Sequence, residues 1–217
     1  MMKKLDDRTR PQVVSRLVSS DGARKYAMRL HDGNLVEAVG IPREDENATS
    51  LLTVCYSTQV GCAMGCAFCA TGKRGLVRNL ETEEMLWQIL IVQRDFGRSA
   101  TAAIAMGQGE PLANYAALVD AVSVIVDPQG FAIDADRTSI STCGLIEGIR
   151  ALAADDVPAT LEISLHSTTQ ELRDKLMPGA RRHPLDRLHA ELAEYCRSTG
   201  KRVLVQYLML VEVNDGD

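Results

Sequence analysis

The stretch "LLTVCYSTQVGCAMGCAFC", residues 51–69, joins a short apolar run to a cluster of cysteines. The run at 51–57 predicts a buried β-strand, because it is short, apolar and followed by a polar loop. The loop carries Cys62, Cys66 and Cys69 with the spacing C-x3-C-x2-C. In α/β proteins, the loops at the carboxyl ends of parallel strands carry the functional groups. The stretch therefore predicts an α/β fold with a site at the end of this strand.

Strand-like and helix-like segments alternate through the rest of the chain. Further strands are expected at 100–106, 137–142, 158–166 and 201–210, and helices at 82–96, 114–126, 144–155 and 184–200. Thr82 is a candidate N-cap of the first helix and Gly200 a candidate C-cap of the last. The alternation predicts parallel strands with crossover helices. A doubly wound sheet and a βα barrel both fit it. The polar pieces "GQGEP", "STCG" and "LHSTT" also follow strands, which favours an enzyme.

The N-terminal part has a different pattern. The segments "KYAMRL" (25–30) and "NLVEAVGIP" (34–42) are joined by "HDG", which predicts a β-hairpin. The polar stretch "PREDENATS" (42–50) is expected to be a loop. We therefore expect an N-terminal extension at 1–50 and a core domain at 51–217. The chain ends just after a predicted strand with no covering helix, so a C-terminal segment of this domain is expected to be missing.

Composition narrows the function classes. Aromatic residues make up 4% of the 217 residues, which disfavours a stacking platform for single-stranded nucleic acid. The net charge of −5 disfavours binding to nucleic acid that is dominated by electrostatic attraction. No apolar leader precedes residue 11, and no apolar run approaches the ~20 residues of a membrane span. A soluble cytoplasmic protein without a membrane partner is expected, of undetermined oligomeric state. In a reducing cytosol, clustered cysteines indicate metal binding or catalysis rather than disulfides.

The cysteine spacing favours an iron–sulfur cluster. Three thiolates can hold three irons of a [4Fe–4S] cluster and leave the fourth iron open. A structural zinc site instead needs four ligands, often from two C-x2-C pairs. The loop has one C-x2-C pair and no histidine nearby. Zinc and a cluster of incidental buried thiols remain the alternatives.

The C-x3-C-x2-C loop after the first core strand resembles the radical S-adenosylmethionine (SAM) superfamily. Longer stretches resemble its RlmN/Cfr family: "DGNLVEAVGIP", "CYSTQVGCAMGCAFCATGKRGLVRNL", "GQGEPLANY", "STCGLIEGIRALA", "ISLHSTTQELRDKLMP" and "VEVNDG". The resemblance implies a partial (βα)6 TIM-like barrel with a short N-terminal hairpin extension. It implies methylation of an adenine carbon, C2 rather than C8, in 23S ribosomal RNA and, in some members, transfer RNA. It also implies SAM bound at the open iron, and an electron donor such as flavodoxin or ferredoxin.

The same resemblance implies roles for individual residues. The cluster ligands would be Cys62, Cys66 and Cys69, and SAM would contact Gly109, Glu110, Ser141, Ser164, Leu165 and His166. Cys55 would form a disulfide with a methyl-carrying cysteine during product release, and Glu37 would accept a proton. The alternatives are ordinary: a small buried strand residue for Cys55, a solvated carboxylate for Glu37, a structural imidazole for His166, and a plain tight turn for "GQGEP".

Some features depart from the family. Gln108 and Cys143 replace its usual residues, and the loop from Arg43 to Ser50 is longer than usual. The family's last strand, its methyl-carrying cysteine and a SAM-contacting asparagine would lie beyond Asp217, and its N-terminal accessory domain has no match. The chain alone is therefore expected to bind cluster and SAM without completing methyl transfer. A radical SAM enzyme with another substrate, and a non-catalytic module on a decayed barrel, are the rival hypotheses. Basic residues at 73–74, Arg78 and "ARRHP" (180–184) are candidate phosphate contacts, although each is also typical of solvated surface.

Overall fold

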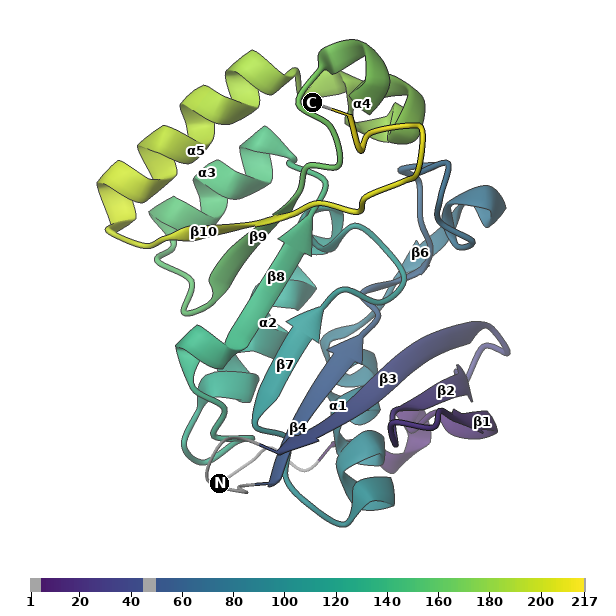
Figure 1. Ribbon diagram of the computed structural model, residues 1–217. Helices are drawn as coiled ribbons and strands as arrows, with labels where there is room; N and C mark the ends of the chain where they lie inside the picture. The colour runs from purple at the N-terminus through teal and green to yellow at the C-terminus, as the bar shows by residue number, and fades with distance from the viewer. Residues whose placement is uncertain (1–4, 45–49, 217) are drawn as a thin grey trace.

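The computed structural model describes residues 5–44 and 50–216, so the start of the chain and most of the expected loop at 42–50 lie outside the described residues. One sheet organises this part of the chain, with the strand order β1-β2-β3-β4-β7-β8-β9-β10 (Figure 1). The strands are β1 Gln12–Val18, β2 Arg24–Arg29, β3 Leu35–Glu44, β4 Ser50–Tyr56, β7 Ala102–Ala105, β8 Thr138–Thr142, β9 Thr160–Ser164 and β10 Val203–Gln206.

The five strands from β4 to β10 are parallel, as the alternating pattern predicted. The helices between them are α1 Thr82–Phe96, α2 Tyr115–Val126, α3 Ile146–Ala154, α4 Gln170–Leu176 and α5 Leu185–Thr199. Short 3-10 helices connect other segments: η1 Asp7–Thr9, η2 Gly72–Arg74, η3 Pro111–Asn114, η4 Ala135–Arg137 and η5 Pro178–Arg182. Neither α4 nor β1 was expected from the sequence.

The sheet has one face covered by helices, which favours the barrel over the doubly wound sheet. Along β4, Leu52, Val54 and Tyr56 are fully buried, whereas the alternate residues Thr53 and Cys55 are half-buried. Figure 1 shows α1 and α2 behind the parallel strands, with the near face of the sheet free of helices. A doubly wound sheet would carry helices on both faces. The structure is therefore a partial TIM-like barrel with its helices on the outside.

Helix α1 shows how local sequence sets the element boundaries. Glu81 is its N-cap, in place of the expected Thr82, because Glu81 and Glu84 form a reciprocal capping box. Gly97 ends the helix with φ 67°, a left-handed conformation that favours glycine. At α5, Gly200 is the C-cap as predicted, with φ 69°.

The predicted N-terminal hairpin is confirmed, and it continues the core sheet. Strands β2 and β3 pair antiparallel, β1 adds outside β2, and β3 pairs antiparallel with β4, so that Val39 lies opposite Cys55. The domain boundary at residue 50 stays a prediction. Among the described residues, no helix has the length and apolarity that crossing a membrane requires.

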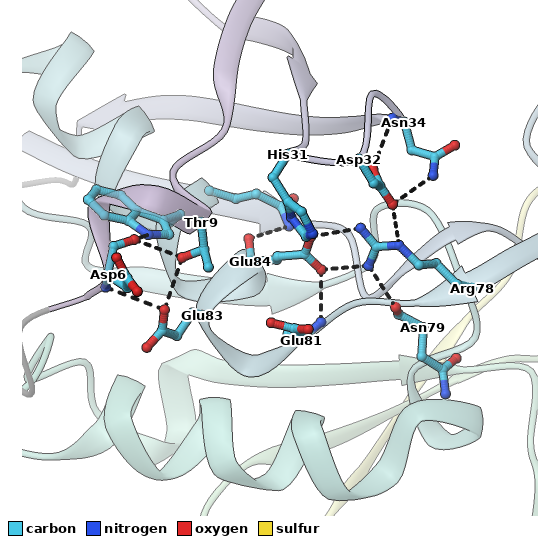
Figure 2. A network of polar contacts seen from close by, with 12 residues as sticks. Asp6, Thr9, His31, Asp32, Asn34, Arg78, Asn79, Glu81, Glu83 and Glu84 are labelled. Atoms are coloured by element: carbon cyan, nitrogen blue, oxygen red, sulfur yellow. Dashed lines mark hydrogen bonds and ion pairs between the residues drawn. The ribbon is translucent and has the colours of Figure 1, made fainter.

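A polar network fastens the hairpin turn to the start of α1 (Figure 2). Arg78 donates to both carboxylate oxygens of the fully buried Glu84, at 2.7 and 2.8 Å, and to Asp32 at 2.6 Å. His31 Nδ1 lies 3.5 Å from Oε1 of Glu84, the oxygen that also accepts from Arg78 Nη2. The guanidinium proposed as a phosphate contact is thus engaged by two carboxylates, and Arg78 holds the fold together at this point.

Candidate functional site

The cysteine loop, which carries Cys62, Cys66 and Cys69, follows the carboxyl end of β4, and its two ends lie side by side. Strand β5 (Gln59–Gly61) enters the loop and pairs antiparallel with β6 (Leu76–Asn79), which leaves it. The backbone N–H of Cys62 donates to Gly75 O at 2.9 Å and closes the base of the loop. The loop therefore begins and ends at one place beside the sheet, and its cysteines stand at the mouth of the barrel.

The segment formed by α4 and η5 grips this loop from the other side. Ala67 N donates to Leu176 O at 2.8 Å, and Gly179 N donates to Met64 O at 2.8 Å. A Cβ atom at Gly179 would lie 2.6 Å from the Cα of Met64, so only glycine allows the two backbones to approach this closely. The fold thus fixes the cysteine loop at both ends and along its middle.

The predicted cluster ligands and most of the predicted SAM contacts gather around one cavity of about 280 Å³. It is lined by Cys62, Cys66, Cys69, Gly109, Glu110, Ser141, Ser164 and His166, together with residues that the sequence did not single out, among them Phe68, Met177, Gln206 and Leu208. Leu165 directly follows β9, which ends at Ser164, and its N–H donates to Gln206 O at 3.0 Å. The structure brings together residues from the ends of five strands, β4, β7, β8, β9 and β10, as the parallel sheet requires.

The "GQGEP" turn packs against Thr58 and Gln59, where the chain enters the cysteine loop. The N–H groups of Thr58 and Gln59 both donate to Gln108 O, and Gln59 Oε1 accepts from Glu110 N at 2.8 Å. Gly109 has φ 108°, and a Cβ there would lie 2.6 Å from the Cβ of Gln59. The glycine is therefore required both by its backbone conformation and by the close approach.

Glu110 is a buried carboxylate held by three donors. Oε1 accepts from Leu112 N at 3.0 Å and from the Thr142 hydroxyl at 2.7 Å, and Oε2 accepts from Cys143 N at 2.8 Å. Burial raises the pKa of Glu110 above its usual value, and these hydrogen bonds oppose that shift. The side chain of Cys143 also acts on this carboxylate and lowers its pKa, and the carboxylate lines the cavity. Thr142 escaped the sequence analysis although it follows the predicted Ser141.

His166 is held in an unusual conformation with φ 56°. Its Nδ1 accepts from Leu208 N at 3.0 Å, which places the proton of the neutral ring on Nε2. Asn214 donates its side-chain amide to His166 O at 2.8 Å, and the Phe68 ring meets the imidazole edge-on at 5.0 Å. Burial lowers the pKa of His166, so the ring is neutral at pH 7. It can therefore offer one N–H donor to the cavity.

The three cysteine side chains are suited to a cluster rather than to a single ion. Within 5–44 and 50–216, no three Cys, His, Asp or Glu side chains converge closely enough to hold one metal ion. Zinc needs all its ligands about 2.0–2.3 Å from one point, whereas each thiolate of an iron–sulfur cluster binds its own iron. Cys62, Cys66 and Cys69 instead surround a shared cavity. Burial raises the pKa of Cys62 to about 11 before any metal is bound.

Cys55 and Glu37 lie outside this cavity. Cys55 is half-buried on the helix-free face of β4, and burial together with the charge of Glu162 raises its pKa to about 11. Glu37 lines a second cavity of about 420 Å³ and pairs with Lys25 at 2.9 Å. The two cavities share Thr71 as a wall. The structure therefore places Glu37 in the neighbouring cavity, and Cys55 lines neither of the two cavities.

Comparison with known proteins identifies the family. Residues 56–217 match the family described as the Radical SAM superfamily, which is most of the chain. The chain belongs to this superfamily.

Its relatives include proteins named "Probable dual-specificity RNA methyltransferase RlmN". The one from Moorella thermoacetica is 43% identical over 210 residues, covering 94% of this chain and 59% of the relative. The one from Synechocystis is 45% identical over 198 residues, covering 91% of this chain and 55% of the relative. The chain thus spans less than two thirds of the length of these curated relatives.

A solved structure shares the fold. The crystal structure of a radical SAM methyltransferase from Sphaerobacter thermophilus superposes with a TM-score of 0.88 at 38% identity. The match covers 96% of this chain and 61% of the other. The partial-barrel architecture that the family resemblance implied is confirmed.

Proposed function

We propose that this chain provides the cluster- and SAM-binding core of an RlmN-type RNA methyltransferase, which methylates C2 of adenine in 23S ribosomal RNA and in transfer RNA. One observation carries the proposal: Cys62, Cys66 and Cys69 share a cavity with the "GQGEP" turn and the ends of β8 and β9. The names of the relatives support the RNA substrate. The chain spans about 55–59% of the length of those relatives, so we propose methyl transfer for the protein as a whole and cofactor binding for this chain.

In this proposal Cys62, Cys66 and Cys69 hold a [4Fe–4S] cluster, and SAM occupies the rest of the cavity. When bound, the cluster supplies the electron for reductive cleavage of SAM. The Glu110 carboxylate receives the ammonium group of SAM, a charge-assisted hydrogen bond in a buried site. Gly109 and the strand-end residues Ser141, Ser164, Leu165 and His166 provide further polar contacts, and Phe68 and Met177 exclude water.

Cys55 and Glu37 take the catalytic roles beside the cavity. The Cys55 thiol acts on the helix-free face of the sheet, as the partner of a methyl-carrying cysteine in releasing the product. Glu37 accepts a proton from the substrate in the neighbouring cavity. That cavity also carries Lys25 and Arg74, whose cations suit contact with RNA phosphates. A reduced flavodoxin or ferredoxin in the cytoplasm supplies the electron.

Anaerobic reconstitution with iron and sulfide tests the site directly. The expected result is about four irons per chain, an electron paramagnetic resonance signal after reduction, and a change of that signal on addition of SAM. Cys69→Ser should lose most of the iron. Cys196→Ser is the matched control, because Cys196 is half-buried on α5 and packs against the main core.

The products then separate the rival functions. The protein in its full natural length should yield 5′-deoxyadenosine and 2-methyladenine in ribosomal RNA. Cleavage of SAM without any mark on ribosomal or transfer RNA would favour another substrate. A chain that takes up no iron would favour a non-catalytic module and would reject the proposal.

A further inference from the structure

Arg173, on α4, is the largest side chain that is fully buried in the described part of the chain. Its Nη2 donates to Cys143 O at 2.6 Å, and its Nη1 reaches His183 O only at 3.5 Å. Its Nε has no hydrogen-bond partner among the described residues. None of the ion pairs formed by those residues includes Arg173. The guanidinium is thus a buried cation without a carboxylate partner.

Such an arrangement is energetically costly. Removing a cation from water costs several kcal/mol unless an anion and further hydrogen bonds compensate for it. Neutralisation does not relieve the cost, because an arginine side chain stays protonated in proteins. Two carbonyl oxygens satisfy part of its hydrogen-bonding capacity here, but no negative charge faces it at contact distance. The structure around Arg173 is therefore suited to an anion that the chain itself does not supply.

The position of Arg173 points to that anion. The carbonyl that it binds belongs to Cys143, which lines the cysteine cavity next to Cys66. One turn later, α4 accepts a hydrogen bond from the cysteine loop, at Leu176 O from Ala67 N. Burial lowers the pKa of Arg173, and the charges of Cys143, Asp174 and Cys66 act in the opposite direction, so that two of these three opposing groups are cysteines of the cavity wall. The guanidinium thus lies just behind the wall of the cavity in which the thiolates gather.

We propose that Arg173 is the counter-ion of the iron–sulfur cluster and sets its reduction potential. The inference rests on the proposed function, because it needs the cluster to be present. Reduction adds one negative charge to the cluster, and a buried cation stabilises the reduced form more than the oxidised form. Cluster potentials respond to net charge and to hydrogen bonds in this way. Arg173 is a positioning and electrostatic residue, since the structure shows it behind Cys143 and not in the cavity.

The test compares Arg173→Gln and Arg173→Lys with the native protein, each reconstituted anaerobically. Gln keeps an amide donor for Cys143 O but removes the charge, whereas Lys keeps the charge. A redox titration followed by electron paramagnetic resonance gives the midpoint potentials. We expect Arg173→Gln to shift the reduction equilibrium at least about tenfold toward the oxidised cluster, which is about 59 mV for one electron. Arg173→Lys should restore most of the shift.

A second readout separates the counter-ion role from a structural one. Without iron, Arg173→Gln should unfold at the same or a higher urea concentration than the native protein, because an unpaired charge has been removed. With the cluster bound, it should unfold at a lower concentration. Arg181→Gln is the matched control, since Arg181 is an exposed arginine on the adjoining η5.

Two results would overturn the inference. One is a native-like midpoint potential in Arg173→Gln. The other is an Arg173→Gln protein that is already destabilised or unfolded without iron, which would make Arg173 a structural tie between α4 and Cys143. A native chain that binds no iron would instead reject the proposed function, so the two failures are distinguishable.

Discussion

Arg78 and Glu84 form a bidentate ion pair whose partners differ in exposure: the Glu84 side chain is 0% exposed and that of Arg78 is 28% exposed. Loss of Arg78 leaves a buried carboxylate, whereas loss of Glu84 leaves a guanidinium that still contacts Asp32 and water. We therefore expect Arg78→Gln to lower the free energy of unfolding by about 3–5 kcal/mol, and Glu84→Gln to cost less.

Urea denaturation of the iron-free protein measures both changes. The double variant Arg78→Gln/Glu84→Gln should recover part of the loss, because it leaves no unpaired buried charge. Arg197→Gln, which removes an exposed pair with Glu194 on α5, should leave the midpoint unchanged. A larger loss for Glu84→Gln than for Arg78→Gln would contradict this interpretation of the network.

The sequence predicted the parts of this protein whose signals are local. Alternating apolar segments gave the parallel strands, and the spacing of Cys62, Cys66 and Cys69 indicated one cavity at the end of β4. Strand β1 was missed because it is exposed along its whole length and shows no buried alternation. The choice between barrel and doubly wound sheet depends on which face of the sheet the helices cover. That is a property of the tertiary structure, so neither the hydrophobic periodicity of the segments nor the spacing of the cysteines predicts it.

Long-range contacts explain the remaining differences. Arg78 was a candidate phosphate contact because an arginine after a loop is usually solvated, and its carboxylate partners are 46 and 6 residues away. Arg173 attracted no attention because a charged residue in a short helix is typical of surface. Its burial depends on α4 folding over the cysteine loop. Short sequence motifs do not show which charges a fold encloses.

Gly179 should be required for cluster retention. Gly179→Ala would place a Cβ 2.6 Å from Met64 Cα and push η5 away from the cysteine loop. Because the Gly179 N–H to Met64 O hydrogen bond would also weaken, we expect the variant to retain less than about half of the native iron after desalting. Gly216→Ala is the control, since nothing lies within 4 Å of its added Cβ. Native iron content in Gly179→Ala would show that the loop tolerates the displacement.

Cys55 should react slowly with alkylating agents at neutral pH. Burial, and secondarily the negative charge of Glu162, raises its pKa to about 11 from the usual 9.0, so the thiolate fraction at pH 8 is about a hundredfold below that of an ordinary thiol. Its alkylation rate should keep rising with pH up to about 11. Glu162→Gln removes a repelling charge, lowers the pKa of Cys55 and should speed the reaction at pH 8.

Mass spectrometry of peptides from iron-free protein follows this reaction, with the Cys196 peptide as internal reference. Saturation of the Cys55 alkylation rate near pH 9, or no effect of Glu162→Gln, would show that burial and Glu162 do not raise the pKa of this thiol. A protonated thiol at neutral pH also suits the proposed role of Cys55, because it would stay unreactive until another group removes its proton.

Removing the hydroxyl group should change the free energy of unfolding in opposite directions at two buried tyrosines. The Tyr56 hydroxyl is buried and has no hydrogen-bond partner among the described residues, so Tyr56→Phe removes an unsatisfied polar group and should stabilise the fold by about 1 kcal/mol. The Tyr26 hydroxyl donates to Asp95 at 2.8 Å, and Tyr26→Phe should cost about 2 kcal/mol, because the acceptor is charged. Urea denaturation of the iron-free variants measures both. Destabilisation by Tyr56→Phe would indicate that an ordered water satisfies its hydroxyl in solution.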